Sequence, residues 1–316
     1  MQEIIKPISK NTLTAELTRD KFVRVTNNGV NEIFIITHHD SPNVMAEIGR
    51  LREVTFRASG GGTGKSIDID EFDTADAPYK QLIVWSPEEK EIVGGYRFIK
   101  CKDAPVGADG VVQLATTELF KFSEKFVRDY VPTTIELGRS FVQPKFQPAI
   151  NNRKGLFSLD NLWDGLGAII IDNPDIHYFF GKVTMYTHFN VHARDMILSF
   201  MAYYFPDKEN LVVPINQLHY KTDVSEFLKS IEGLNYKDGH RILNHNVRDL
   251  GEQIPPLVNS YMNLSATMKT FGSSANAHFG EVEETAILVS IADIYESKKE
   301  RHVATYKKII SNKNGN

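Results

Sequence analysis

The sequence has little cysteine and no long apolar run. Cys101 is the only cysteine in 316 residues; this excludes a disulfide within the chain and a zinc site built from several cysteines, and it fits a reducing compartment. The longest nearly apolar runs, 166–171 and 196–205, are shorter than the ~18 residues that a membrane-spanning helix needs. The first residues also lack the apolar segment of a secretory signal. We therefore expect a cytoplasmic protein that is not integral to a membrane.

A strong excess of basic charge is also missing, since the formal net charge is −4. This balance argues against a protein dedicated to nucleic-acid binding. Basic residues gather in the C-terminal segment 296–316, where six lysines and arginines stand against two glutamates. This tail is either a solvated end, helical or frayed, or a surface that docks on an acidic protein or peripherally on the anionic inner face of the membrane.

Hydrophobic periodicity alternates between strand and helix along the whole chain. Strands are predicted at 22–25, 32–37, 79–85, 91–100, 133–142, 177–188, 211–214 and 285–295, with the third and fourth forming a hairpin. Helices are predicted at 42–56, 116–130, 159–170, 191–204, 223–231, 240–253 and 255–269. The pattern predicts a single α/β (α+β) domain over 1–316, with a mixed central sheet flanked by helices and with N-terminal strands within 1–40.

Several short motifs suggest a function but lack the context it needs. The segment 59–66 resembles a phosphate-binding loop, but Ser59 stands where the pattern requires glycine, so we interpret it as a mobile glycine-rich loop or lid. The pairs His38-His39-Asp40 and His245 with Asp249 are interpreted as surface pairs. Signatures of metalloproteases, α/β-hydrolases and dinucleotide-binding enzymes do not occur.

Four stretches combine charged residues with glycine or an aromatic residue. They are Arg52-Glu-Val-Thr-Phe56, Asp68-Ile-Asp70-Glu-Phe72-Asp73, Ile92-Val-Gly94-Gly95-Tyr96-Arg97-Phe98 and Ile135-Glu136-Leu-Gly138-Arg139-Ser140-Phe141. Taken singly, each is typical of a solvated run or a cross-strand salt bridge. In this order, the set resembles the acyl-carrier-protein-using branch of the GNAT-like acyltransferases, namely the ornithine-acyl-ACP N-acyltransferase family often labelled "hemolysin". The acyl-homoserine lactone synthases are more distant relatives of that branch.

The resemblance covers roughly residues 45–295. It continues in Leu162-Trp163, in 181–186 with Thr184 in place of a serine, in 254–257 with Tyr261, and in His278-Phe279. The sequence departs from the family at His278, where an acidic residue is usual, and at Gln147, where a Tyr-Arg pair is common. The resemblance implies a GNAT-like mixed sheet with a C-terminal extension.

The resemblance also implies an activity: transfer of a (3-hydroxy) fatty acyl group from acyl carrier protein, or from acyl-CoA, to the amine of an amino acid in the synthesis of ornithine- or glycine-type lipids. No permanently bound cofactor and no metal are expected. The expected partners are acyl carrier protein and a small amino-acid acceptor, and ornithine, glycine and lysine all stay open as acceptors. Two alternatives also stay open: a signal synthase like the homoserine lactone enzymes, and a non-catalytic protein that binds acyl carrier protein or lipid.

The chemistry needs a base, oxyanion donors and alignment of the reactants. An amine attacks a thioester directly, so Cys101 is expected to be inert. Glu136 is the predicted base; its rival role is an ion pair with Arg97 or Arg139, which would lower its pKa. The predicted substrate-binding residues are Arg52, Phe56, Asp68, Asp70, Asp73, Arg97, Arg139 and Ser140. Either an arginine clamps the acceptor carboxylate while an aspartate holds its ammonium, or the whole set is a buried ion-pair network.

The donor is expected to bind elsewhere on the same domain. Arg153, Lys154 and Gly155 are predicted to hold the phosphopantetheine phosphate at a helix start, and the single glycine there favours acyl carrier protein over coenzyme A. The acyl chain needs an apolar slot, for which the candidates are Trp163, Phe179, Phe180, Phe200 and Tyr204. The alternative is that these aromatic residues are simply core.

Overall fold

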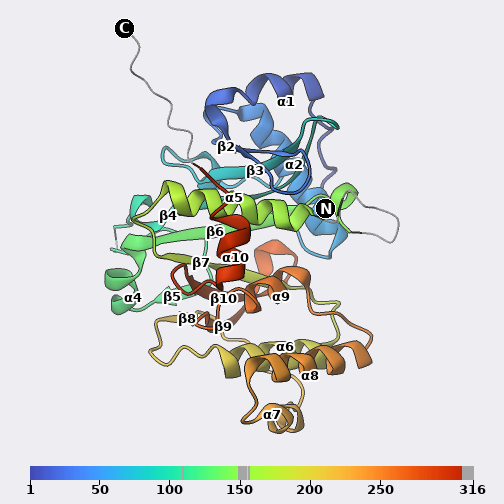
Figure 1. The fold of residues 1–316 in the computed structure, drawn as a ribbon, viewed down its shortest axis with the longest axis vertical. Coiled ribbons are helices and arrows are strands. Elements are labelled where there is room, and N and C mark those ends of the chain that lie inside the picture. The colour runs from blue at the N-terminus through green and yellow to red at the C-terminus, as the bar shows by residue number, and fades with distance from the viewer. Residues whose placement is uncertain (109, 149–154, 156, 308–316) are drawn as a thin grey trace.

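An eight-stranded mixed sheet forms the centre of the protein. The computed structural model describes residues 1–108, 110–148, 155 and 157–307, and Figure 1 shows the sheet with helices on both sides. In sheet order the strands are β1 (Phe22–Val25), β2 (Glu32–Ile36), β3 (Lys80–Ser86), β4 (Glu91–Lys100), β6 (Thr134–Val142), β7 (Tyr178–Met185), β10 (Val282–Ser290) and β9 (Lys269–Asn276). All neighbours are antiparallel except β6 and β7, which are parallel. The predicted mixed α/β sheet is confirmed.

Successive side chains of β3 point to opposite faces of the sheet and show that a layer of helices covers each face. Leu82 packs in a buried cluster with Leu162 and Leu166, whereas its neighbour Ile83 packs with Ile48. The first cluster includes α5 (Ser158–Asp172) and the second α2 (Pro42–Ala58). Since successive strand residues point to opposite faces, α5 and α2 cover opposite faces of the sheet.

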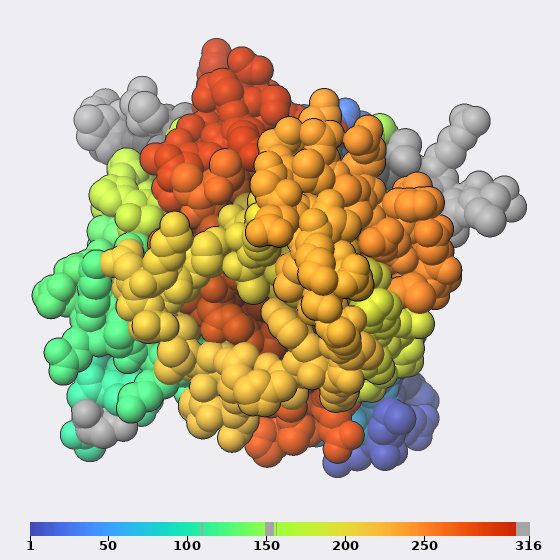
Figure 2. Space-filling view, turned by 90° about the horizontal axis from the view of Figure 1, so that it is seen from below, coloured from blue at the N-terminus to red at the C-terminus, as the bar shows by residue number. Residues whose placement is uncertain are grey.

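The other helices extend these two layers and the lower edge of the sheet. They are α1 (Lys10–Glu16), α3 (Glu71–Thr74), α4 (Glu124–Asp129), α6 (Val191–Tyr204), α7 (Ser225–Ile231), α8 (Tyr236–Asp249), α9 (Pro256–Met262) and α10 (Glu296–His302). Figure 2 shows a hollow on the lower face, framed by the yellow and orange segments that include α6 and α8. A groove there is lined by residues that include Met201 of α6, Ser273 of β9 and Leu218 from the segment after β8.

The segment after β4 corrects one prediction. A helix was expected over 116–130, but the chain there forms a turn, the strand β5 (Phe120–Phe122) and then the short helix α4. Strand β5 pairs with β8 (Val212–Pro214) in a separate two-stranded sheet, and the Ser123 side chain caps the helix that follows. The apolar spacing of this segment therefore serves packing against the large sheet, where Phe126 contacts Phe180.

A second helix prediction, over 255–269, holds only for its first part. Helix α9 ends at Met262, and the edge strand β9 begins at Lys269. Strand β9 is rich in serine and carries Gly272 with a positive φ of 84°, so it lacks the run of branched apolar residues that marks a strand. The N-terminal region contains β1 and β2 together with α1, and the C-terminal tail begins with α10, while residues 308–316 lie outside the described part.

The two parallel strands β6 and β7 stay together for only part of their length. Their register ends at Leu137 opposite Gly181, although β6 continues to Val142 and β7 to Met185. Gly181 allows the close approach at this last pair, because an added Cβ would lie 2.5 Å from the Leu137 carbonyl oxygen. Beyond that pair the two strands part.

We expect Gly181→Ala to destabilise the protein by about 1–3 kcal/mol, because the new methyl group would push against backbone at this last pair. Urea unfolding measures the change. Gly138→Ala is the matched control, since its Cβ would have its nearest neighbour at 3.5 Å. Equal unfolding midpoints for the two variants would contradict the close approach.

Candidate active site

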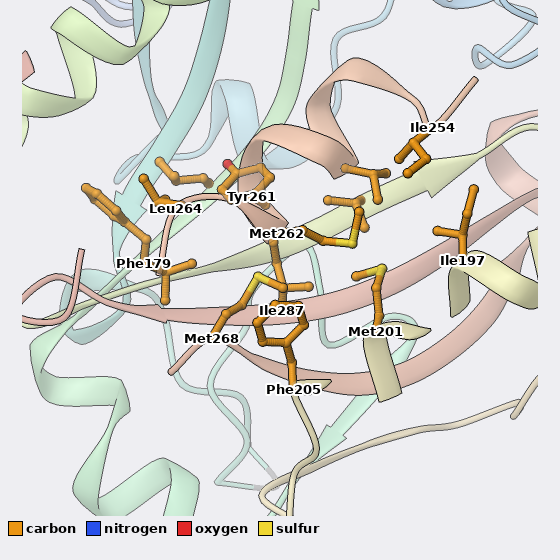
Figure 3. Close-up of a cluster of buried hydrophobic side chains, with 14 of the residues drawn as sticks. Phe179, Ile197, Met201, Phe205, Ile254, Tyr261, Met262, Leu264, Met268 and Ile287 are labelled. Atoms are coloured by element: carbon orange, nitrogen blue, oxygen red, sulfur yellow. The ribbon is translucent and has the colours of Figure 1, made fainter. Parts of the chain in front are cut away.

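A pocket passes through the sheet where β6 and β7 part. Its polar lining lies on the face that α2 covers and includes Arg97, Thr116, Glu136, Arg139, Lys182 and Glu284. Its apolar lining includes Tyr96, Leu137, Phe179, Leu257, Tyr261 and Ile287, all within or beside the cluster that contains α5. Figure 3 shows Phe179, Tyr261 and Ile287 in this cluster. The pocket therefore offers charged groups beside Phe56, Phe180 and Phe279 on one side of the sheet, and an apolar lining on the other.

Six of the predicted residues form one buried network of ion pairs beside this pocket. Arg52 lies 3.0 Å from Asp73, and Arg97 lies 2.7 Å from Asp70 and 3.4 Å from Asp73. The third cation of the network, Arg139, is also paired with two aspartates.

Arg139 lies 2.9 Å from Asp68 and 3.5 Å from Asp70. Three arginines thus face three aspartates, and their formal charges cancel. Burial raises the pKa of Asp70, but the guanidinium groups of Arg97, Arg139 and Arg52 together outweigh this and lower the pKa to about 2. The sequence placed these six residues together correctly.

Local structure holds the acidic residues of this network in place. Asp70 and Asp73 close a capping box at the start of α3, in which each side chain accepts a hydrogen bond from the other residue's backbone N–H. Arg52 also donates to Gln81 of β3 at 2.6 Å. The network therefore ties α2, the loop before α3 and β3 to one another.

A bulge in β6 directs Arg139 toward the aspartates. The register of β4 with β6 shifts between Gly95 and Arg97, and Arg139 has a positive φ of 48°. In a regular strand Arg139 would share a face with Leu137, on the side of α5. The extra residue reverses this alternation, so the guanidinium reaches Asp68 and lies 4.4 Å from the centre of the Phe279 ring.

Glu136 is buried and has four hydrogen-bond donors around it. The hydroxyls of Tyr79 and Thr116 donate to its carboxylate, as do the backbone N–H groups of Thr116 at 3.0 Å and Ala115 at 3.3 Å. Burial and the negative charge of Glu136 raise the pKa of Tyr79 well above its usual value, so this hydroxyl stays protonated as a donor. Among the ion pairs of the described residues, none includes Glu136, which leaves its predicted rival role without support.

The other predicted residues divide between pocket and core. Phe56 and Ser140 line the pocket, as do Phe179 and Phe180, and Trp163 stacks edge-on against the pocket residue Tyr261 at 5.4 Å. Phe200 and Tyr204 instead pack around Tyr236 of α8. These two aromatic residues therefore belong to the core between α6 and α8.

The predicted phosphate site is described only at Gly155. Arg153 and Lys154 lie outside the described residues. Gly155 is buried, and an added Cβ would overlap the carbonyl group of Gln147. The glycine at this position is therefore required by a close approach of two backbone segments.

Sequence reasoning missed two charged residues of the pocket, Lys182 and Glu284. Lys182 follows Gly181 in β7, two positions after Phe180, and Glu284 follows Glu283 near the start of β10. Because side chains alternate between the two faces of a strand, Lys182 shares a face with Phe180 and Thr184. A charged residue beside a phenylalanine on one face of a central strand was the signal that the sequence offered. For the described residues, no group of three histidine, cysteine, aspartate or glutamate side chains has the arrangement of a metal site, and no described helix is long and apolar enough to span a bilayer.

Comparison with known proteins shows the family to which the chain belongs. A family described as "Acetyltransferase (GNAT) domain" matches residues 51–151. The glycine N(alpha)-acyltransferase of Bacteroides thetaiotaomicron is 53% identical over 97% of this chain and 91% of its own length. The protein of the same name from Phocaeicola vulgatus is 52% identical over 98% of this chain and 94% of its own length. This chain belongs to their family of acyltransferases.

Two solved structures are more distant. FeeM, an N-acyl amino acid synthase from uncultured soil microbes, is 12% identical with a TM-score of 0.39, over 83% of this chain and 90% of its own. The AHL synthase LasI is 13% identical with a TM-score of 0.32, over 54% and 78%. The prediction of a GNAT-like acyltransferase is confirmed by the relatives.

Cys101 offers a direct check that the reaction uses no cysteine nucleophile. The thiol is buried, and burial together with the negative charge of Glu136 raises its pKa well above the usual value. We expect a thiol reagent such as DTNB to label the native protein slowly and the denatured protein at once. Cys101→Ala should retain acyltransferase turnover, and a loss of turnover with unchanged melting would contradict an inert thiol.

Arg52 and Arg139 should respond differently to removal. Arg52→Met leaves Asp73 with less compensation in a fully buried site, so we expect a loss of about 3–5 kcal/mol of stability. The Arg139 side chain is 14% exposed, so Arg139→Ala should lower the stability by less than Arg52→Met does. Because Arg139 borders the pocket, the same substitution should abolish turnover. Thermal melting and turnover, measured on both variants, separate the two roles; an active, stable Arg139→Ala protein would refute this division.

Proposed function

We propose that the protein transfers a fatty acyl group from a thioester to the amino group of glycine, with acyl carrier protein as the donor. The observation that carries the proposal is the pocket through the sheet, because a fatty thioester and a charged amino acid need surroundings of opposite polarity. The acceptor is suggested by the name of the two relatives. The single glycine at 151–155 and the basic tail favour an acidic carrier protein over coenzyme A.

The reaction forms one bond and breaks one. The amine nitrogen attacks the thioester carbonyl carbon, the C–N bond forms, and the C–S bond breaks to release the thiol. Of the two protons that leave the ammonium nitrogen, one ends on the departing sulfur and the other passes through a base to solvent. Backbone N–H groups of β6 beyond Leu137, where β7 no longer pairs with it, supply donors for the oxyanion.

Glu136 remains the proposed base. It borders the pocket on the polar face, and its Thr116 partner is a hydroxyl that can rotate away when the acceptor arrives. Loss of that donor frees one lone pair of Oε1 for a proton, while the backbone N–H groups of Thr116 and Ala115 keep the side chain in position. The product is an N-acylglycine, an amino-acid lipid.

One assay tests the activity. The purified protein is mixed with a 3-hydroxyacyl carrier protein or the matching acyl-CoA, and with glycine, ornithine, lysine or S-adenosylmethionine, and products are read by mass spectrometry. We expect N-acylglycine from the carrier-protein donor. An acylated product from another acceptor alone, a homoserine lactone, or binding without turnover would overturn the proposal.

The role of Glu136 has its own test. Glu136→Gln should reduce turnover at least ~10²-fold, the range for a lost acid–base group, because the amide cannot take up the proton. Glu124→Gln, on the exposed first turn of α4, is the matched control and should keep full activity. A fully active Glu136→Gln protein would show that the proton leaves by another route.

A further inference from the structure

An ion pair that the sequence analysis did not identify lies across the pocket from Arg97 and Arg139. Lys182 of β7 is paired with Glu284 of β10, and both side chains line the pocket. Thr184 and Asn276 lie 3.5 Å and 3.3 Å from the same carboxylate and donate to it. Only 13% of the Lys182 side chain and 3% of the Glu284 side chain are exposed.

The two walls of the pocket differ in how fully their cations are paired. Arg97 has two carboxylate partners and Arg139 also has two. Lys182 has three N–H donors, and within the described ranges its hydrogen bonds go to Glu284 alone. A negative charge brought by a ligand therefore finds free N–H donors at Lys182, which has one carboxylate partner where Arg97 and Arg139 each have two.

A contribution to the stability of the fold does not explain why a charged pair is buried at this place. A buried lysine–carboxylate pair loses about as much in desolvation as it gains by attraction, and apolar residues would often serve as well. Among the neighbours on this face, Phe180 and Ala286 are apolar, whereas Thr184 and Asn276 donate hydrogen bonds to the carboxylate. A charged pair kept at the pocket wall, where the strands part, points to a charged ligand.

We propose that Lys182 and Glu284 together bind the zwitterion of the acceptor amino acid, with Lys182 holding its carboxylate and Glu284 its ammonium group. This inference rests on the proposed function and specifies where the acceptor binds. A zwitterion carries one charge of each sign a few ångströms apart, so it can insert into an ion pair and replace both halves of it. The network of three arginines and three aspartates then holds the loop before α3, and its members Arg97 and Arg139 also form the opposite wall of the pocket.

The size of the site agrees with a small acceptor. The free volume of the pocket is about 70 Å³, and a water-sized position needs roughly 10–15 Å³. Few atoms fit beside a thioester in that space, and Phe56 and Phe279 close it on the side of α2. An amino acid without a side chain places its two charged groups at the pair with the least crowding.

Kinetics of Lys182→Met and Glu284→Gln test the proposal. Each variant should raise the KM for glycine at least ~10-fold, with a smaller change in kcat and an unchanged KM for the acyl donor. Lys121→Met, an exposed lysine on β5, is the matched control and should leave all three constants unchanged. Unaltered glycine KM in both pocket variants would overturn the inference.

Two further arms separate recognition from simple loss of structure. Lys182→Arg keeps the positive charge and should preserve most of the glycine affinity. The double variant Lys182→Met/Glu284→Gln leaves no unpaired charge and should therefore melt near the wild-type temperature. Glycinamide lacks the carboxylate, so Lys182→Met should use it as well as the wild-type protein does. An equal loss with glycine and glycinamide would show that Lys182 does not read the carboxylate.

Direct binding distinguishes failure of this inference from failure of the proposed function. Calorimetric titration of glycine into the wild-type protein and into the double variant needs no acyl donor. Binding to the wild-type protein that the double variant loses supports the acceptor site. If the wild-type enzyme acylates glycine while the double variant keeps the wild-type KM, the acceptor site is wrong and the activity stands; if glycine is not acylated, the proposed function fails first.

Discussion

The separation of two parallel strands creates the pocket in which we place the reaction. Strands β6 and β7 pair from Thr134 to Leu137 and then leave each other, and Gly181 permits the tight contact immediately before they part. A parallel sheet is normally closed on both faces. Here the gap connects the apolar layer under α5 with the charged layer under α2. The polar groups of the pocket lie around that gap.

The charges around the gap are arranged to be nearly neutral. The three arginines and three aspartates cancel, and Lys182 cancels Glu284, so the region can be buried without a large uncompensated charge. The bulge at Arg139 is essential to this balance, because it brings a guanidinium to the face where Asp68 and Asp70 lie. Glu136 takes its compensation from hydrogen-bond donors instead of a cation.

The sequence predicted the parts of the site that depend on short, ordered motifs. Arg52, the three aspartates, Arg97 and Arg139 stand in four compact stretches, and the fold brings them together. Lys182 and Glu284 come from strands about 100 positions apart in the chain, so only sheet pairing makes them neighbours. The helix expected at 116–130 was wrong for a related reason: β5 exists because it pairs with β8, nearly a hundred residues later, and apolar spacing within one segment does not contain that partner.

The contacts of Glu136 also have a consequence for the wall of the pocket. Its carboxylate fastens the Ala115–Thr116 turn to the middle of the sheet, and that turn leads directly into β5 and the small sheet with β8. Because Ala115 and Thr116 themselves line the pocket, the hydrogen bonds to this one buried carboxylate hold part of the pocket wall against the central strands.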